Sequence, residues 1–411
     1  MKTIGIILFG CLFMPISAWG NVPPLTLEKA LEIAQIRAPE QVLSQHDTTI
    51  SQAERLKANR YPNPQVEFGI GPNFENLNGK IVDTNLFVAG SINQEIVLWG
   101  KQKLRKEIAD QNISISKIQE MVTAQDIEFK VRVLYAAIQR SQARVALIQN
   151  NIQVDQRFVG GTQLKFQQNE VPYADVLRAK LELATQHKNL IKEQKDLKVL
   201  KEKLNLLLAR DLNTSFRASD SFEPIKSLPP LKSLLARSLN RPEYQSIQVQ
   251  QKRNEKEIRL AKQQAKPNLI AGFFAEKDGP DRSFGPSIGI ELPIAYRNKG
   301  EIETAKAKKL KINFQRDYLA KQIELQVRNN YLELQKTIES LTLQKEMIKN
   351  TGDLFRTTFQ AYLEGKTEFL RFLETLETIN ELKIEYFDTL FEYFTKKAEL
   401  ERAIGGPLVS K

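Results

Sequence analysis

The residue types that most often do chemistry are few in this sequence and are poorly placed for it. The two histidines, His46 and His187, lie far apart without a second ligand at a metal-binding spacing, so each is interpreted as a polar helix position. Gly69-Ile70-Gly71 precedes a Pro-Asn turn rather than a helix and is therefore no phosphate-binding loop. No nucleophile has a recognisable activating neighbour. We expect a protein that is not an enzyme and that holds neither a cofactor nor a metal.

The first twenty residues have the character of an export signal. Lys2 is followed by an apolar run and then by Ala18-Trp19-Gly20, a small-x-small site before Asn21. Leu8-Phe9-Gly10-Cys11 faintly resembles a lipoprotein box, but it lies so early that Cys11 is interpreted as an ordinary signal-peptide residue. The mature chain then has no cysteine and must be held by packing. No stretch of about 18 apolar residues follows, so no helical membrane anchor is expected.

The charge balance limits the partners. The chain carries a formal net charge of +11 at pH 7, and 27% of its residues are charged. Nucleic-acid-binding proteins gather such charge into a patch or stripe, whereas here the lysines are interspersed with glutamates and glutamines along helical segments. We therefore expect solvated helix faces and no nucleic-acid partner.

The chain repeats itself with a period of about 200 residues. Pro62-Asn63 returns as Pro267-Asn268, and Ala209-Arg210 closes the first copy as Gly405-Gly406 closes the second. Any function must therefore suit a duplicated unit. The predicted organisation is a signal peptide at 1–20, a first repeat at 21–210, a linker at 211–230, a second repeat at 231–406 and a tail at 407–411.

The residue pattern of each half predicts a helix of medium length, a pair of strands, a very long helix, a turn and another helix of medium length. The first helix is expected from Leu25 to Asn59. The segment after Gly100 is a long helix that breaks near Asn169, and it carries a coiled-coil seam of Ile127, Val131, Leu134, Ile138, Val145, Ile148 and Ile152. Its counterpart runs from Gly300 to a turn near Gly365. At 1.5 Å per residue the two long helices are ~105 Å and ~98 Å, lengths that suit a tube or a rod.

Four short segments between the helices predict strands, at 65–71, 86–96, 268–276 and 285–293. In the second and fourth, apolar residues alternate with small or polar ones, which suits a lipid-facing barrel strand and equally a half-buried strand of a soluble sheet. Four strands cannot close a barrel, and open edges are not tolerated in hydrocarbon. If the strands enter a membrane, several protomers must therefore pool them, and two, three or four copies all satisfy this condition.

Several short motifs follow one another in the order seen in a known family. They are Arg60-Tyr61-Pro62-Asn63-Pro64, Gln94-Glu95-Ile96 with Gly100-Lys101, Arg297-Asn298-Lys299-Gly300 and Tyr362-Leu363-Glu364-Gly365-Lys366. With these motifs the chain resembles the TolC-like outer membrane efflux proteins, specifically the CzcC-like branch that works with heavy-metal resistance-nodulation-division pumps. The likeness covers nearly the whole mature chain.

The resemblance implies a fold that is mainly α with a small β part. Duplicated long coiled-coil helices would form an α-barrel, and four strands per protomer would be pooled in an oligomeric transmembrane β-barrel. It implies a homotrimer in the outer membrane that extends into the periplasm, with a periplasmic adaptor (membrane fusion) protein and an inner-membrane resistance-nodulation-division pump as partners. The implied function is passive export of metal cations or small toxic solutes, as the channel component of a tripartite efflux system.

The two turns between long and medium helices would then be periplasmic tips. The resemblance assigns adaptor docking to Asn169, Glu170, Val171, Gly365, Lys366 and Thr367, and a pore constriction to Asp175, Tyr362, Arg371 and Glu374. Arg371 stands where the family often has an acidic residue, so it would neutralise Glu374 or make the mouth less favourable to cations. The alternative for both turns is an ordinary interhelical connection with no gating role.

A second hypothesis is a periplasmic coiled-coil adaptor or scaffolding protein. Adaptors usually carry one helical hairpin among compact β domains, whereas this chain duplicates its hairpin and adds four strands. Outer-membrane fractionation distinguishes the two. No motif specifies the cargo or the pump.

Overall fold

The computed structural model describes residues 23–77, 80–224 and 228–408 of the 411-residue chain. The predicted signal peptide at 1–20 lies outside the described residues, as do residues 409–411 of the predicted tail. The described part is mainly helical with a small sheet, which confirms the predicted fold class at the level of one protomer.

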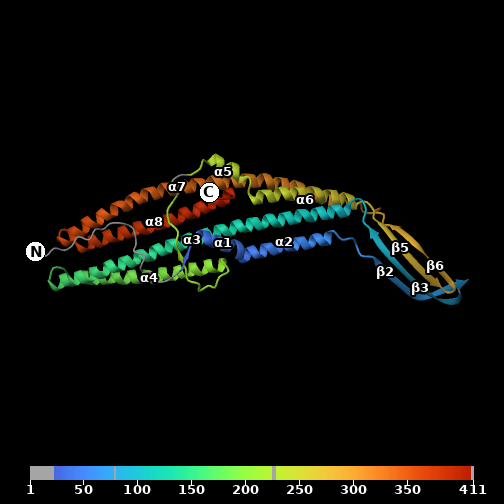
Figure 1. The fold of residues 1–411 in the computed structure, drawn as a ribbon, viewed down its shortest axis with the longest axis horizontal. Coiled ribbons are helices and arrows are strands. Elements are labelled where there is room, and N and C mark those ends of the chain that lie inside the picture. Colours follow the sequence, from blue (N-terminus) through green and yellow to red (C-terminus); the bar gives the residue numbers. More distant parts are fainter. Residues whose placement is uncertain (1–22, 78–79, 225–227, 409–411) are drawn as a thin grey trace. The chain divides into compact units, whose positions relative to one another are not determined.

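The order of elements runs twice along the chain (Figure 1). The first run comprises α1 (Leu27–Arg37), α2 (Pro39–Ala58), β2 (Gln65–Leu77), β3 (Lys80–Ile96), α3 (Lys101–Gln167) and α4 (Tyr173–Leu207). The second comprises α5 (Leu231–Ser238), α6 (Pro242–Gln264), β5 (Leu269–Asp278), β6 (Asp281–Ile290), α7 (Lys299–Leu363) and α8 (Phe369–Ile404). Outside this scheme, β1 (Pro24–Leu25) pairs in parallel with β4 (Arg217–Ala218).

The single helix predicted from Leu25 to Asn59 is in fact two helices. Thr26 caps the first, since its hydroxyl accepts the Lys29 amide at 3.2 Å. The break falls at Ala38 because Pro39 lacks an amide hydrogen and disfavours helical geometry in the residue before it. Pro39 is then well placed in the first turn of α2, where that hydrogen would have no partner.

The two very long helices end in the same turn geometry. They contain 67 and 65 residues, or ~100 Å each at 1.5 Å per residue. Beyond their ends, Asn169 and Gly365 take left-handed backbone conformations with φ of 58° and 70°. The next amide in each turn, that of Glu170 or of Lys366, donates back over the turn to the carbonyl five residues earlier, at 2.9 and 2.8 Å. This helix-ending motif lets the chain reverse direction at once.

The described residues divide into two compact units that do not coincide with the two runs of elements. Unit 1 comprises the described residues of Met1–Ala38, Glu128–Lys226 and Lys336–Thr395, and unit 2 those of Pro39–Ile127, Ser227–Gln335 and Lys396–Lys411. Each unit takes segments from both halves of the chain. Unit 1 contains both helical turns, and unit 2 contains the four-stranded sheet.

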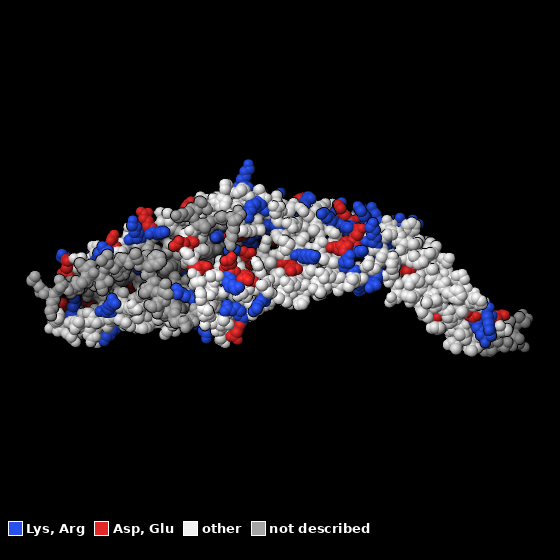
Figure 2. All heavy atoms as spheres, viewed as in Figure 1, with Lys and Arg blue, Asp and Glu red and all other residues white. Residues whose placement is uncertain are grey.

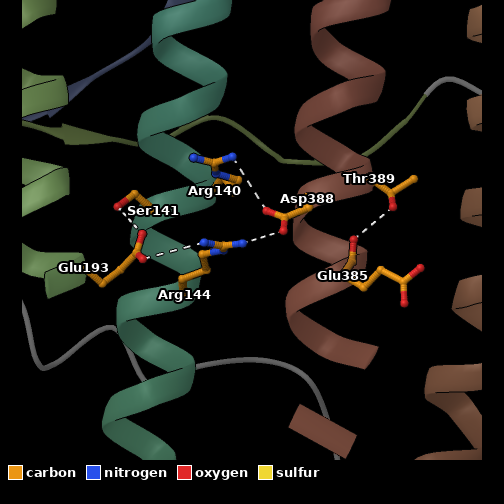
Figure 3. Close-up of polar contacts among 7 residues, drawn as sticks. All are labelled: Arg140, Ser141, Arg144, Glu193, Glu385, Asp388 and Thr389. Carbon is orange, nitrogen blue, oxygen red and sulfur yellow. Dashed lines mark hydrogen bonds and ion pairs between the residues drawn. The ribbon is translucent and has the colours of Figure 1, made fainter. Parts of the chain in front are cut away.

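Within unit 1, an ion-pair network joins α3 to α4 and α8 (Figure 3). The Arg144 guanidinium on α3 donates to the Asp388 carboxylate on α8 and lies 3.7 Å from that of Glu193 on α4. Arg140, one turn away on α3, lies 3.7 Å from Asp388, and Ser141 donates to Glu193 at 2.8 Å. Two helical hairpins are thus tied together through one side of α3.

The predicted linker at 211–230 contributes to the packing of unit 1. The Phe216 ring is buried, and the following residues form β4. The Tyr135 hydroxyl accepts the Ser219 amide at 3.1 Å and lies 2.5 Å from the Asp220 carboxylate and 2.8 Å from the Leu25 carbonyl. Burial and this carboxylate raise the pKa of Tyr135, so the hydroxyl stays protonated as a donor.

The sheet of unit 2 has the order β2-β3-β5-β6 and is antiparallel throughout. The register pairs Val66 with Ile92 between β2 and β3, Ile92 with Phe273 between β3 and β5, and Phe273 with Pro286 between β5 and β6. Both hairpins extend further than predicted, because antiparallel backbone pairing continues beyond the apolar positions that signalled the strands. The last strand ends at Ile290 rather than 293.

Candidate functional site: a two-faced sheet and two helical turns

One face of the sheet is mostly apolar although nothing described covers it. The register places the residues of this face in neighbouring rows. Several of their side chains are far more exposed than those of core residues; Phe68 is 86% exposed and Ile288 is 76% exposed. This apolar face consists of Val66, Phe68, Ile70, Leu86, Val88, Ile92, Ile96, Leu269, Phe273, Phe284, Ile288 and Ile290. Water-soluble monomers rarely expose an apolar surface of this extent, so lipid or protein must cover it.

The opposite face is polar and acidic. It carries small and hydroxyl or amide side chains, with Phe87, Ile270 and Phe274 as apolar exceptions. Among the strand residues whose side chains are described, the charged ones on this polar face are all carboxylates, namely Glu67, Glu95, Glu276, Asp278 and Asp281. A lumen lined in this way would attract cations and repel anions.

Both outer edges of the sheet lack a partner strand among the described residues. β2 pairs only with β3, and β6 pairs only with β5. Their outer N–H and C=O groups therefore cannot enter hydrocarbon unless a further strand pairs with them. Leu86 to Ile96 spans ~33 Å along the strand, or ~25 Å after a tilt of about 40°, which matches the apolar band of outer-membrane barrels.

Aromatic side chains mark the helix-proximal end of this apolar band. Tyr61, Trp99 and Tyr296 are exposed there, beyond the rows of Ile96 and Ile290. Trp99 also donates from Nε1 to the Pro267 carbonyl at 2.7 Å. Tyrosine and tryptophan prefer the level of lipid headgroups, where an apolar ring and a polar tip are both satisfied.

The motifs that carry the family resemblance meet where the strands join the helices. The Lys101 ammonium donates to the Lys266 carbonyl at 2.6 Å and to the Asn268 amide oxygen at 2.8 Å. Asn268 in turn donates to Glu95, while Gln94 donates to the Pro62 carbonyl at 2.8 Å. These residues fasten the backbone at the junction, so their role is structural rather than chemical.

Gly272 allows two polar side chains to meet across a strand. On the polar face, Asn93 of β3 and Ser287 of β6 flank it, with 3.5 Å between the Ser287 hydroxyl and the Asn93 amide oxygen. A Cβ at position 272 would lie 2.1 Å from the Asn93 oxygen and 2.6 Å from the Ile92 carbonyl. Only glycine therefore fits there.

The helical turns carry the residues predicted to dock an adaptor. Asn169, Glu170 and Val171 lie in the α3–α4 turn, and all but the half-buried Val171 are exposed. Gly365, Lys366 and Thr367 lie in the α7–α8 turn, with Lys366 paired to Glu364 at 2.6 Å. Both turns lie at the same end of unit 1 (Figure 1). The structure thus brings together two surfaces that are about 200 residues apart in sequence.

The predicted constriction residues lie one turn inside these tips but differ in accessibility. Arg371 and Glu374 are exposed on α8, and no ion pair between them is among the contacts described. Asp175 is half-buried at the start of α4, and its carboxylate lies 3.8 Å from the Arg178 guanidinium. The side chains of Asp175, Arg371 and Glu374 are thus accessible enough to line a constriction.

Tyr362 does not have that accessibility. Its ring is only 7% exposed and lies 5.5 Å from the ring centroids of both Phe158 and Phe372. Phe158 and Phe372 also stack on each other, and the Lys165 ammonium lies 4.5 Å above the Tyr362 ring. This cluster joins α3, α7 and α8 behind the turns. The Tyr362 ring is thus packed within the protomer, and its part in a constriction stays a prediction.

Asp155 is an unusual carboxylate in the same bundle. It is 8% exposed, and its Oδ2 atom has no hydrogen-bond partner among the described residues. Burial is the larger cause that raises its pKa to about 6, and the charge of Glu182 on α4 adds to the shift. Sequence reasoning missed Asp155, because an isolated aspartate on a charged helix has the pattern of a solvated residue.

Two further features concern bound ions and helices in membranes. In the described part of the chain, no three histidine, cysteine or carboxylate side chains gather closely enough to hold a metal ion. Among the described residues, no helix combines the length and apolar character needed to cross a bilayer.

The chain is similar in sequence to one protein family and to one metal-resistance protein. Residues 236–406 match the family model described as "Outer membrane efflux protein". The cobalt-zinc-cadmium resistance protein CzcC of Cupriavidus metallidurans is 21% identical over 407 residues, which cover 96% of this chain and 94% of the relative.

Solved structures share the fold over nearly the full length. A crystal structure of CusC aligns with a TM-score of 0.78 at 13% identity and covers 95% of this chain and 96% of its own. The outer membrane protein VceC of Vibrio cholerae aligns with a TM-score of 0.75 at 14% identity and covers 93% and 97%. The resemblance predicted from the sequence motifs is thereby confirmed: the second half of this chain matches the outer membrane efflux protein family, and nearly the whole chain shares the fold of these solved outer membrane proteins.

Proposed function

We propose that the protein is the outer-membrane channel component of a tripartite efflux system and acts as a passive export conduit. The observation that carries this function is the sheet, with one exposed apolar face, one acidic face and two unpaired edges. Such a sheet suits a barrel wall that has lipid on one side and water on the other. No step of the proposed function changes its cargo chemically.

The unpaired edges require several copies of the chain. Three protomers would pool twelve strands, a number within the range of outer-membrane barrels, and the family resemblance favours this trimer over two or four copies. The helices supply further contact surface. On α7, Tyr318, Leu325 and Leu332 recur every seven residues and are exposed. A seven-residue apolar repeat is the seam by which helices of neighbouring protomers would pack.

The lining of the conduit suits cations. The carboxylates of the polar face would line the lumen of the pooled barrel, and the similar protein CzcC is named for resistance to cobalt, zinc and cadmium. Metal cations are therefore the favoured cargo, with small toxic solutes as the broader class. A conduit of this kind need not bind its cargo tightly.

The helical turns would form the periplasmic end. In this proposal the exposed turn residues, Asn169 and Glu170 in one turn and Lys366 in the other, contact a periplasmic adaptor that links the channel to an inner-membrane resistance-nodulation-division pump. Val171, Gly365 and Thr367 shape the same turns. Asp175, Arg371 and Glu374 would surround the constriction, with the Tyr362 ring packed behind them.

Membrane fractionation and gel mobility test the proposed function together. We expect the protein in the outer-membrane fraction, and the detergent-extracted, unheated sample should migrate as a threefold oligomer that heating converts to the monomer. A soluble periplasmic monomer would contradict the channel and favour a coiled-coil adaptor. In a strain without redundant channels, deletion should lower tolerance to metal cations or small toxic solutes; unchanged tolerance would contradict the export role.

A further inference from the structure

We propose that Lys277 and Arg282 form a binding site for the phosphate of a lipid headgroup at the end of the β5–β6 hairpin farthest from the helices. The inference rests on the proposed function in one respect, namely that the apolar face of the sheet contacts lipid. The occupant is a phosphorylated membrane lipid rather than free phosphate or a protein. Three features of the β5–β6 hairpin carry the argument.

The first feature is the separation of charge between the two faces. The hairpin sequence Lys277-Asp278-Gly279-Pro280-Asp281-Arg282 pairs Lys277 with Arg282 and Asp278 with Asp281. Because successive strand residues point to opposite faces, both basic side chains lie on the apolar face and both aspartates on the polar face. Neither aspartate can therefore neutralise the basic pair from across the sheet.

The second feature is the repulsion between the positive charges of Lys277 and Arg282. Like charges directly opposite each other on neighbouring strands are destabilising, and here they stand as cross-strand partners. Both side chains are exposed, and no ion pair of either is among the contacts described. An anion bound between them would remove the repulsion and supply charge-assisted hydrogen bonds.

The third feature is the apolar surface beside the pair. The next row on the same face pairs Ala275 with Phe284, and the Phe284 ring lies 6.5 Å from that of Phe273. Figure 2 shows a basic group with acidic atoms beside it near the far end of the sheet, beyond a stretch of its surface that carries few charges. An amphiphile would place its phosphate between Lys277 and Arg282 and an acyl chain along Phe284. Free phosphate would gain nothing from these rings.

The depth of the pair in a bilayer is consistent with this ligand. Basic residues on the lipid face of a barrel are costly at the bilayer midplane and nearly without cost at the interface. Lys277 and Arg282 form the last row of the apolar face on β5 and β6, level with Val88 of β3, and the exposed ring of Trp99 stands at the other end of the band. On these two strands the apolar face thus ends in a basic row, which suits contact with lipid phosphates.

Lipid binding to the purified oligomer tests the proposal. Native mass spectrometry would compare dioleoyl phosphatidic acid with dioleoylglycerol, which has the same acyl chains and no phosphate. We expect the unmodified protein to prefer the phosphorylated lipid. Lys277→Gln with Arg282→Gln should weaken this preference by about fivefold per removed charge, and Lys277→Arg with Arg282→Lys should retain it.

A matched control removes the same charge elsewhere. Lys188 and Lys192 are exposed on α4, and their replacement by glutamine should leave the preference unchanged. Equal loss in this control, or an unchanged preference in the Lys277 and Arg282 glutamine variant, would overturn the proposal. Displacement of phosphatidic acid by millimolar inorganic phosphate would also overturn it, since the site would then recognise phosphate alone. An oligomer that enters the outer membrane without any preference would refute this site but not the channel.

Discussion

At the scale of single residues, the sheet depends on close contacts over Gly272. Asn93 and Ser287 approach each other across this position, and an added methyl group would collide with the Ile92 carbonyl, which cannot rotate away. The Asn93 amide also donates to the Ser91 hydroxyl at 3.1 Å. The space above the β5 backbone is thus filled by neighbours from two other strands.

Replacement of Gly272 by alanine should therefore destabilise the protein. We expect a loss of about 1–3 kcal/mol, the usual cost of overpacking, because the clash involves backbone as well as side chain. Samples heated to increasing temperatures before gel electrophoresis would show the loss of stability as a lower temperature of oligomer dissociation. Gly69→Ala on β2 is the matched control, since no atom lies within 4 Å of a Cβ built there. Equal stability of the two variants would show that the close approach of Asn93 and Ser287 over Gly272 is not needed.

Asp155 makes stability depend on pH in the direction opposite to most aspartates. Its pKa in the folded protein is about 6, above the ordinary 3.8, so the folded state holds the proton more tightly than the unfolded state. Stability should therefore fall as pH rises from about 4 to about 6 and stay reduced above that range. Asp155→Asn should stabilise the protein at pH 7.5 by about 1–3 kcal/mol and have little effect near pH 4.

Urea denaturation of the detergent-solubilised protein at both pH values would measure this difference. Asp353→Asn is a suitable control, because that aspartate is exposed on α7 and lies 3.9 Å from Arg356 in a surface ion pair. Such a pair contributes little to stability. A neutral or destabilising effect of Asp155→Asn at pH 7.5 would show that the carboxylate has a favourable partner.

At the scale of elements, the helical turns depend on backbone conformations that few residues accept. Gly365 has a φ of 70°, which costs an L-residue roughly 1–2 kcal/mol, and its turn is closed by the hydrogen bond from Lys366 to Ala361. Gly160, by contrast, lies inside α3, where a glycine weakens the helix. The two glycines therefore have opposite effects on stability.

The same substitution at these two positions should change stability in opposite directions. Gly365→Ala should lower the free energy of unfolding by about 1 kcal/mol, while Gly160→Ala should raise it by about 0.5–1 kcal/mol. Parallel thermal denaturation of the two variants, monitored by helical circular dichroism, would measure both. Stabilisation by Gly365→Ala would mean that the turn does not need its left-handed residue.

At the scale of the whole molecule, the acidic face of the sheet determines which ions the pooled barrel favours. Glu67 and Glu276 are exposed, and no ion pair of either is described. Repeated in each protomer, these carboxylates would give the lumen a negative potential. The basic pair Lys277 and Arg282 lies on the opposite face, separated from the lumen by the sheet.

Neutralising the lumen should therefore lower cation selectivity. We expect Glu67→Gln with Glu276→Gln to reduce the ratio of cation to anion permeability several-fold, as judged by reversal potentials across planar bilayers under a salt gradient. The variant Lys277→Gln with Arg282→Gln is the control and should leave the ratio nearly unchanged. Selectivity that is unaffected by the glutamate changes would place the filter elsewhere, such as at Asp175 and Glu374.

Features that depend on neighbours in the chain could be predicted from the amino-acid sequence. Alternation over Leu86–Ile96 predicted a two-faced strand, the apolar seam after Gly100 predicted a very long helix, and the motif around Gly365 predicted its reversal. These signals are local, because side-chain direction and helix termination depend on a few consecutive residues. The charge order of 277–282 was also readable, although its meaning depends on which face is apolar.

Contacts between segments that are distant in sequence could be read only from the folded protein. The tertiary structure placed β3 beside β5, so that Gly272 lies between Asn93 and Ser287, and it buried the Tyr362 ring that sequence reasoning had assigned to the pore. It also buried Asp155 without a partner for one of its oxygens. Burial and close approach depend on packing between elements that are far apart in sequence, and no local pattern of residues reports that packing.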